Sequence, residues 1–235
     1  MRRLAPFVGA VGAAWLRTHV RRRLRNDGDG PAGFFVPLAW VEAVWGPLPE
    51  RRLSPEAPST ILADWVECGG VMRMTTDYFL GRGDWADLVR STDGDPVREE
   101  ARQLAAAGLE YRQTEAYQSL IDALHRPGPR PQRQGRLLDT EAAVDAYFER
   151  FVRLFHSIER HGVLSQPALR ERGIRFNDDR GLGVAVDASG RLHRLQGGNH
   201  RWAIAQVLGV PEVPVELRLI HAAQVPDDVA RYLGL

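Results

Sequence analysis

The sequence predicts a chain of the α+β or α/β class, in which a small mixed-sheet domain follows a mostly helical region. Residues 136–235 show a long amphipathic helix, two short strands, a short helix and an alternating strand in succession. Residues 34–124 show mainly helical patterns that Gly and Pro interrupt. Between the two regions, residues 126–135 read RPGPRPQRQG, a composition that disfavours regular structure. We therefore predict a boundary at this linker, with a mostly helical N-terminal region at 1–130 and the mixed-sheet domain at 136–235.

The N-terminal region carries two clear helix signals. Residues 96–107 form one helical pattern, which ends at Gly108, a favourable C-cap. Residues 114–124 form a second helical pattern, which Thr114 can cap. Residues 4–16 are apolar and flanked by arginines, but the run is shorter than the roughly 20 residues that cross a bilayer. Two interpretations of this Arg-rich segment stay open: a helix that packs on the body of the protein, or an amphipathic helix that contacts an anionic membrane surface or a partner.

Helices and strands succeed one another in the C-terminal region. Residues 142–160 predict a helix with an aromatic stripe, and Gly162 ends it. Residues 182–187 and 191–195 predict two strands joined by a tight turn at 188–190. A helix at 200–208 stops at Gly209, and a strand follows at 215–220, where apolar residues alternate with Glu216 and Arg218. Residues 226–233 predict a final helix.

The composition excludes several function classes. The chain has 31 basic and 30 acidic residues, and its net charge of +1 gives no strong nucleic-acid signal. Lysine is absent, which excludes a Walker A loop, a pyridoxal Schiff base and a lysine general base. The single cysteine, Cys68, cannot form a disulfide within the chain or a cysteine zinc site. From this cysteine usage we expect a cytoplasmic protein.

The most informative stretch, residues 195–205, reads LQGGNHRWAIA. Gly197 and Gly198 end a strand, and a helix begins at once, at Asn199 or His200. Backbone N–H groups at a helix start attract anions, and glycine lets a ligand approach the backbone closely. His200 and Arg201 add side-chain donors, so one interpretation is a phosphate site. The other is a glycine turn with a capping asparagine and a surface arginine.

A second polar pattern lies on the predicted helix at 142–160. Arg150, Arg153 and Ser157 stand at i, i+3 and i+7, so they share one stripe of the helix. Two arginines and a hydroxyl in a row suit a polyphosphate and a ribose. A solvated polar face would show the same spacing, and the periodicity leaves both interpretations open.

The sequence GGNHR at 197–201, followed by Ala203 and by Val-Pro-Val at 213–215, resembles the signature of the ParB/sulfiredoxin-like superfamily. Residues 150–158 resemble the sulfiredoxin helix that meets the nucleotide, and residues 229–234 are similar to the last helix of sulfiredoxins. The resemblance implies a strand-to-helix turn that holds ATP phosphates. It places Arg150 where sulfiredoxins have a lysine and Ser157 where they have a threonine.

Asn199 is the main departure from that signature, because sulfiredoxins carry their catalytic cysteine at this position. Asparagine cannot act as the sulfur nucleophile, so we do not expect sulfiredoxin activity. The superfamily also includes free-serine kinases, whose similar Gly-His-x-Arg turn holds a nucleotide for phosphoryl transfer. These kinases are the nearest functional comparison that the resemblance offers.

We therefore expect a phosphotransferase that uses ATP or ADP, or else CTP, with Mg²⁺, and acts on a small hydroxylated metabolite. Glu149, His200 and Arg201 are the candidate catalytic residues. Asp84 and Glu115 are candidates for an acceptor pocket, and no protein-bound metal site is expected. The alternative from another class is a non-catalytic nucleotide-sensing module of ParB type. A third, a DNA-associated ParB-like protein, has only the arginine-rich first 25 residues in its favour.

Overall fold

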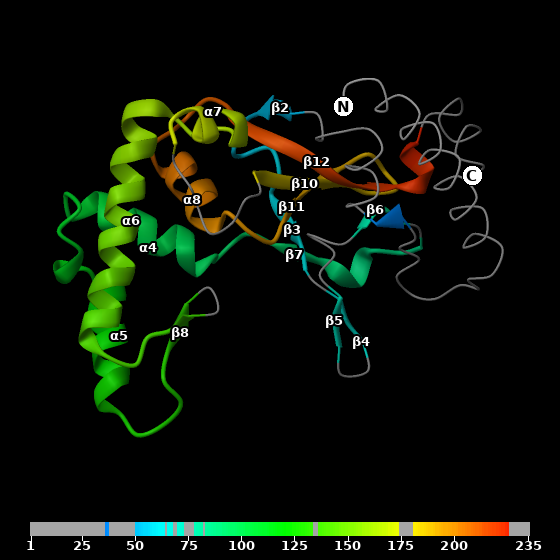
Figure 1. Cartoon of the computed structure of the whole chain (residues 1–235). Helices are drawn as coiled ribbons and strands as arrows, with labels where there is room; N and C mark the ends of the chain where they lie inside the picture. The colour runs from blue at the N-terminus through cyan, green and yellow to red at the C-terminus, as the bar shows by residue number, and fades with distance from the viewer. Residues whose placement is uncertain are drawn as a thin grey trace, which may run out of the picture. The chain divides into compact units, whose positions relative to one another are not determined.

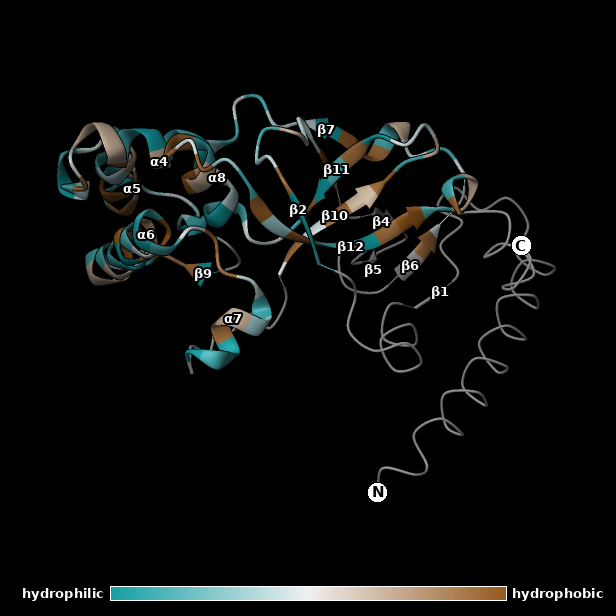
Figure 2. Cartoon of the chain, turned by 90° about the horizontal axis from the view of Figure 1, so that it is seen from above, coloured by the Kyte–Doolittle hydropathy of each residue, from teal (hydrophilic) through white to brown (hydrophobic). Residues whose placement is uncertain are grey.

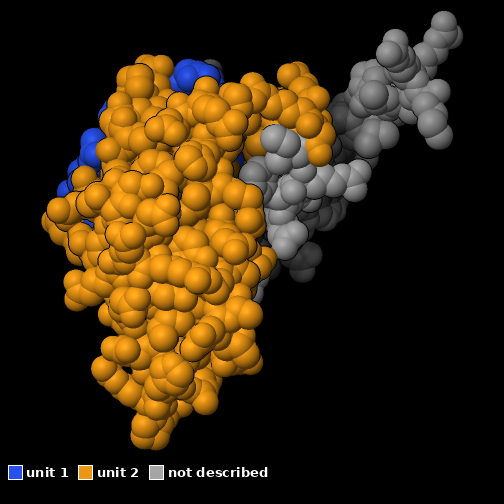
Figure 3. Space-filling view, turned by 90° about the vertical axis from the view of Figure 1, so that its left-hand side faces the viewer, with its two compact units in different colours: residues 1–92, 175–197, 214–235 blue, residues 93–174, 198–213 orange. Residues whose placement is uncertain are grey.

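The computed structural model describes residues 36–37, 50–63, 65–67, 70–72, 78–81, 83–133, 136–173 and 181–225 (Figure 1). The chain divides into two compact units, which Figure 3 colours separately. Unit 1 comprises residues 1–92, 175–197 and 214–235, and unit 2 comprises residues 93–174 and 198–213. Both units are discontinuous in sequence, whereas the sequence predicted a single boundary at the linker. The helices predicted at 4–16 and 226–233 lie outside the described residues.

Unit 1 is built on a mixed sheet (Figure 1). The strand order is β1-β6-β12-β10-β11-β3-β7, and β2 also pairs with β12. The strands are β1 (Val36–Pro37), β2 (Glu50–Leu53), β3 (Thr60–Leu62), β6 (Tyr78–Gly81), β7 (Val89–Ser91), β10 (Leu182–Val186), β11 (Leu192–Leu195) and β12 (Val213–His221). Strand β10 is antiparallel to β11 and parallel to β12, and β11 is parallel to β3. The structure therefore confirms the mixed α/β class and the strands predicted at 182–187, 191–195 and 215–220.

The prediction of a mostly helical N-terminal region is wrong for the described part of residues 50–91. This part contains β2, β3, β6 and β7, a separate ladder of β4 (Trp65–Glu67) with β5 (Gly70–Met72), and the 3-10 helix η1 (Ala86–Leu88). Each of these strands has three or four residues. A run this short is compatible with a helical period as well as with strand alternation, so hydrophobic spacing could not separate the two.

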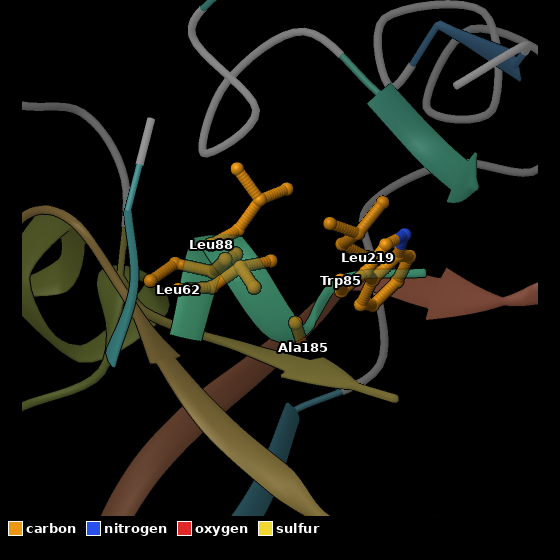
Figure 4. Close-up of a cluster of buried hydrophobic side chains, with 6 residues drawn as sticks. Leu62, Trp85, Leu88, Ala185 and Leu219 are labelled. Carbon is orange, nitrogen blue, oxygen red and sulfur yellow. The ribbon is translucent and has the colours of Figure 1, made fainter. Parts of the chain in front are cut away.

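A buried apolar cluster connects the central strands of unit 1 with η1 (Figure 4). Its members come from β3, the η1 turn, β10, β11 and β12: Leu62, Trp85, Leu88, Ala185, Leu195 and Leu219. Each is at most 6% exposed. Segments from residues 62–88 and 185–219 therefore share one core, which explains why the early strands belong to the same sheet as the late ones.

The turn between β10 and β11 is held by a buried carboxylate. Asp187 accepts hydrogen bonds from the backbone N–H groups of Ser189 (2.8 Å) and Arg191 (2.9 Å). His193, 1% exposed, bridges Asp187 through Nε2 (2.9 Å) and Thr60 through Nδ1 (2.7 Å). Although burial opposes ionisation, these hydrogen bonds hold the pKa of Asp187 far below its usual range. This network ties β3 to the hairpin.

Strand β12 departs from simple alternation at Arg218. The sequence placed Arg218 with the polar set, yet its side chain is buried and pairs with Glu216 at 2.9 Å. It also donates to the backbone oxygen of Gly181 at 2.6 Å. A Cβ at Gly183 would lie 3.0 Å from the Arg218 side chain, so the small residue makes room for the buried guanidinium.

Unit 2 contains all five α-helices of the described residues. They are α4 (Pro96–Ala106), α5 (Glu115–His125), α6 (Glu141–His161), α7 (Gln166–Glu171) and α8 (Asn199–Val207). The helices predicted at 96–107, 114–124, 142–160 and 200–208 are confirmed within two residues at each end, and α7 was not predicted. Figure 2 shows hydrophilic and hydrophobic residues along α4, α5 and α6, as amphipathic helices require. No helix in the described part of the chain combines the length and apolar content needed to span a bilayer.

Helix α6 is the central element of unit 2. The side chain of Thr140 caps the N-terminus of α6, and Gly162, with a φ of 67°, ends the helix. Its buried residues recur at helical spacing: Val144, Tyr147, Phe148, Phe151, Phe155 and Ile158. Helices α5 and α8 both pack against α6, and α4 packs against α8.

The segment predicted as a linker contains regular structure. A short hairpin joins β8 (Gln132–Arg133) to β9 (Arg136–Leu137), with Arg133 opposite Arg136. The 3-10 helix η2 (Tyr111–Gln113) precedes α5. The linker prediction is therefore wrong at 132–133, where the chain forms a strand and the Arg133 side chain contacts Glu100 of α4.

Candidate functional site

Helix α8 begins differently from the other helices of unit 2. Helices α4, α5, α6 and α7 are each capped by a side-chain oxygen, from Asp95, Thr114, Thr140 and Ser165. The N-cap of α8 is Gly198, which has a left-handed φ of 67° and no side chain to accept from the first amides. Asn199 is the first helical residue, one of the two starts that the sequence predicted.

His200, in the first turn of α8, is fixed against α6. Its Nε2 lies 2.9 Å from the hydroxyl oxygen of Tyr147. Its ring makes an edge contact with Phe151, with the centroids 4.2 Å apart. These two contacts set the position of the α8 start relative to the polar stripe of α6.

Tyr147 is itself held by a buried carboxylate on α4. Its hydroxyl donates to Glu100 Oε2 at 2.6 Å, while Arg133 Nε donates to Glu100 Oε1 at 3.0 Å. The Glu100 side chain is only 5% exposed, so Arg133 supplies the charge that its burial requires. Burial, followed by the Glu100 carboxylate, raises the pKa of Tyr147 far above its usual value. Tyr147 therefore stays protonated.

This chain of hydrogen bonds fixes the proton on His200. Burial, followed by the charge of Arg150, lowers the pKa of His200 to about 4, so the ring is neutral at neutral pH. The single hydroxyl proton of Tyr147 goes to the ionised Glu100, which has none to donate. His200 must then donate from Nε2 to Tyr147, which makes Nδ1 the acceptor nitrogen.

Arg136 and Arg153 lie close enough to Arg150 for their charges to act on it, and we name Arg136, Arg150 and Arg153 the arginine cluster. Burial in the first place, and then the charges of Arg136 and Arg153, lower the pKa of Arg150. Glu149 lies 3.7 Å from Arg153, with both side chains more than half exposed. An exposed pair at this distance is weak, so the cluster remains electropositive.

The predicted cofactor residues fall mostly within unit 2. Arg150, Arg153 and Ser157 lie along α6, where Arg150 and Ser157 are half-buried and Arg153 is exposed. The α8 start supplies Gly198, Asn199, His200 and Arg201, all half-buried. Gly197, with a φ of 111°, is the last residue of its segment in unit 1. The structure thus brings the α6 stripe and the α8 start together through the contacts of His200.

The predicted acceptor residues are not brought into this group by any contact described above. Asp84, exposed and in unit 1, lies just before η1 and accepts a hydrogen bond from the backbone N–H of Ala86 at 2.8 Å. Glu115 is the exposed first residue of α5 in unit 2. Both positions are ordinary for a carboxylate at the start of a helix.

Sequence reasoning missed Glu100, Tyr147, Arg133 and Arg136. Tyr147 counted only as a member of the apolar stripe, and the two arginines were taken as part of a linker. Glu100 did carry a signal, because it shares the buried face of α4 with Val97 and Leu104. A carboxylate on an apolar helical face predicts a buried partner.

The described residues include no group of three or more His, Cys, Asp or Glu side chains placed to hold a metal ion. No protein-family model, curated protein or solved structure matches the chain.

Proposed function

We propose that the chain is a nucleotide-dependent phosphotransferase of the ParB/sulfiredoxin-like type, acting in the cytoplasm on a small hydroxylated metabolite. The observation that carries the proposal is the arginine cluster, of which Arg150 acts on His200 in the first turn of the glycine-capped helix α8. Phosphate oxygens readily accept hydrogen bonds from backbone N–H groups at helix N-termini and from guanidinium groups. ATP, ADP or CTP would supply such oxygens, and Mg²⁺ would arrive on the nucleotide.

In this proposal the nucleotide phosphates bind between α6 and the α8 start. Arg150 and Arg153 would contribute positive charge. The backbone at Gly197, Gly198 and Asn199 would let the phosphates come close to its N–H groups. Arg201 and Ser157 are the remaining candidate ligands. The neutral His200 holds the start of α8 against α6 through Tyr147.

The acceptor hydroxyl needs a group that takes its proton, and Glu149 is the candidate on α6. Its pairing with Arg153 at 3.7 Å leaves it 54% exposed and free to change rotamer. Glu100 is unsuitable, because Tyr147 and Arg133 already use both of its oxygens inside the unit.

The second candidate function, a non-catalytic nucleotide-sensing module, is favoured by one observation. Glu100 uses both of its oxygens inside unit 2, and the weak, exposed pair of Glu149 with Arg153 does not fix the Glu149 carboxylate toward an acceptor. A module that only binds a nucleotide needs no carboxylate aimed at an acceptor.

Nucleotide binding and turnover separate these functions. Calorimetric titration and thermal shift with ATP, ADP, CTP and GTP, with and without Mg²⁺, are measured on wild type, Arg150→Ala and Arg201→Ala. Arg102→Ala is the matched control, because Arg102 lies on the exposed face of α4 and pairs only at the surface with Glu99. Losing a charge-assisted phosphate contact costs about 1.5–3 kcal/mol, so affinity falls about tenfold or more in the two site variants.

If no nucleotide binds the wild type, the proposal is wrong. If a nucleotide binds in an Arg150-dependent way but no hydroxylated acceptor ever consumes it, the sensing module replaces the enzyme.

A further inference from the structure

The β8–β9 hairpin is anchored to the interior of unit 2. Arg133 on β8 reaches the buried Glu100 at 3.0 Å, and Glu100 in turn accepts from Tyr147. Arg136 on β9 is the register partner of Arg133. The hairpin is therefore fixed to the same tyrosine that positions His200.

The anchored hairpin holds the positive charge of Arg136 near that of Arg150, and the two charges repel each other. Arg136 is exposed, yet its charge contributes to lowering the pKa of the nearby Arg150. The charge of Arg133 is balanced by Glu100, whereas the arginine cluster has three charges and one described carboxylate partner, Glu149 on Arg153. Like charges held together by a buried network lower the stability of the fold, unless an anion between them offsets the repulsion.

We propose that Arg136 binds phosphate together with Arg150 and Arg153, and that the arginine cluster takes the phosphoanhydride part of its ligand. The hairpin then forms a third wall of the site, beside α6 and the α8 start. This inference rests on the proposed function for the identity of the whole ligand, but it concerns the pyrophosphoryl group alone.

The choice of a phosphoanhydride over a single phosphate follows from the charges. A single phosphate group carries a charge of about −1.5 to −2 near neutral pH, so three guanidinium charges exceed what it can neutralise. Two linked phosphates carry more negative charge and therefore match three arginines better. Inorganic pyrophosphate is therefore the minimal probe of the site.

The test is calorimetric titration of the full chain with inorganic pyrophosphate and with inorganic phosphate. The variants are Arg136→Ala and Arg150→Ala, with Arg102→Ala as a control for the loss of one exposed charge. We expect pyrophosphate to bind the wild type more tightly than phosphate, to weaken at least tenfold in Arg136→Ala, and to change less than twofold in Arg102→Ala. Circular dichroism of each variant checks that unit 2 is folded.

Equal weakening in Arg136→Ala and Arg102→Ala would overturn the inference, as would a wild type that does not bind pyrophosphate. The inference and the proposed function fail separately. If ATP binds wild type and Arg136→Ala equally, the inference is wrong and the function stands. If pyrophosphate binding depends on Arg136 but no nucleotide binds, the function is wrong and the inference stands.

Discussion

Mild acid should destabilise unit 2 through His200. In the folded protein the pKa of this ring is about 4, against 6.5 for an ordinary histidine. Between these two values the unfolded chain binds a proton that the folded chain does not, so stability is fully present above pH 6.5 and falls as the pH drops toward 4. The structural reason is the packing of the ring against Phe151 and the nearby charge of Arg150.

The expected loss follows from the two pKa values. Their difference corresponds to about 3 kcal/mol in total, of which about 2 kcal/mol is lost by about pH 5. Because native domains are stable by only about 5–15 kcal/mol, a loss of this size is easily measured. The matching readout is far-UV circular dichroism during urea unfolding, since all described α-helices belong to unit 2.

His200→Gln removes the titrating ring and should flatten this pH dependence, whatever it does to stability at neutral pH. His125→Gln is the control, because the His125 side chain is 67% exposed and should leave the pH dependence unchanged. If His200→Gln loses as much stability between neutral pH and pH 5 as the wild type does, then His200 is not the group that titrates, and the argument from its burial is wrong.

Three further outcomes test the structure. Tyr147→Phe should lower the free energy of unfolding by about 1.5–3 kcal/mol in urea, because it removes a hydrogen bond to the buried, ionised Glu100; a change below 0.5 kcal/mol, the size of an ordinary surface substitution, would contradict this network. Asp187→Asn should destabilise the fold at neutral pH, and the difference from wild type should shrink progressively as the pH falls below 3.8, because the wild-type carboxylate keeps its full contribution only above that value; acid unfolding curves of the two proteins compare this directly. Gly198→Ala and Gly209→Ala should each cost about 1–2 kcal/mol for a left-handed φ, but only Gly198→Ala should weaken pyrophosphate binding, as calorimetry would show.

The sequence was sufficient where an element is long and carries its own end signals. Helices α4, α5 and α6 have strong hydrophobic spacing, with Thr114 and Gly162 as end signals. The α8 start was predicted to within one residue, because two glycines mark it. In each case local chemistry alone fixes the element.

The sequence was insufficient where distant residues complete an element or a site. Strand β3 pairs with β11, more than a hundred residues away, and three residues give no usable period. Arg133 and Glu100 form their pair only after α4 and the hairpin meet, so RPGPRPQRQG looked like a linker. Arg218 looked exposed because alternation cannot show that Glu216 and glycine positions accommodate a buried guanidinium.

The candidate site consists of two groups of residues: those that position His200 and the α8 start, and the arginine cluster. The ring atoms of His200 are used by Tyr147 and Phe151, so His200 serves first to hold the α8 start against α6. In the proposed function, the charge of the ligand would be met by the arginine cluster, whose residues come from two separate elements, α6 and β9. The Glu100 carboxylate joins the two groups, because it anchors Tyr147 with one oxygen and the hairpin with the other. A single buried residue thereby fixes both the helix start and the third arginine, although it lies too deep to contact a ligand itself.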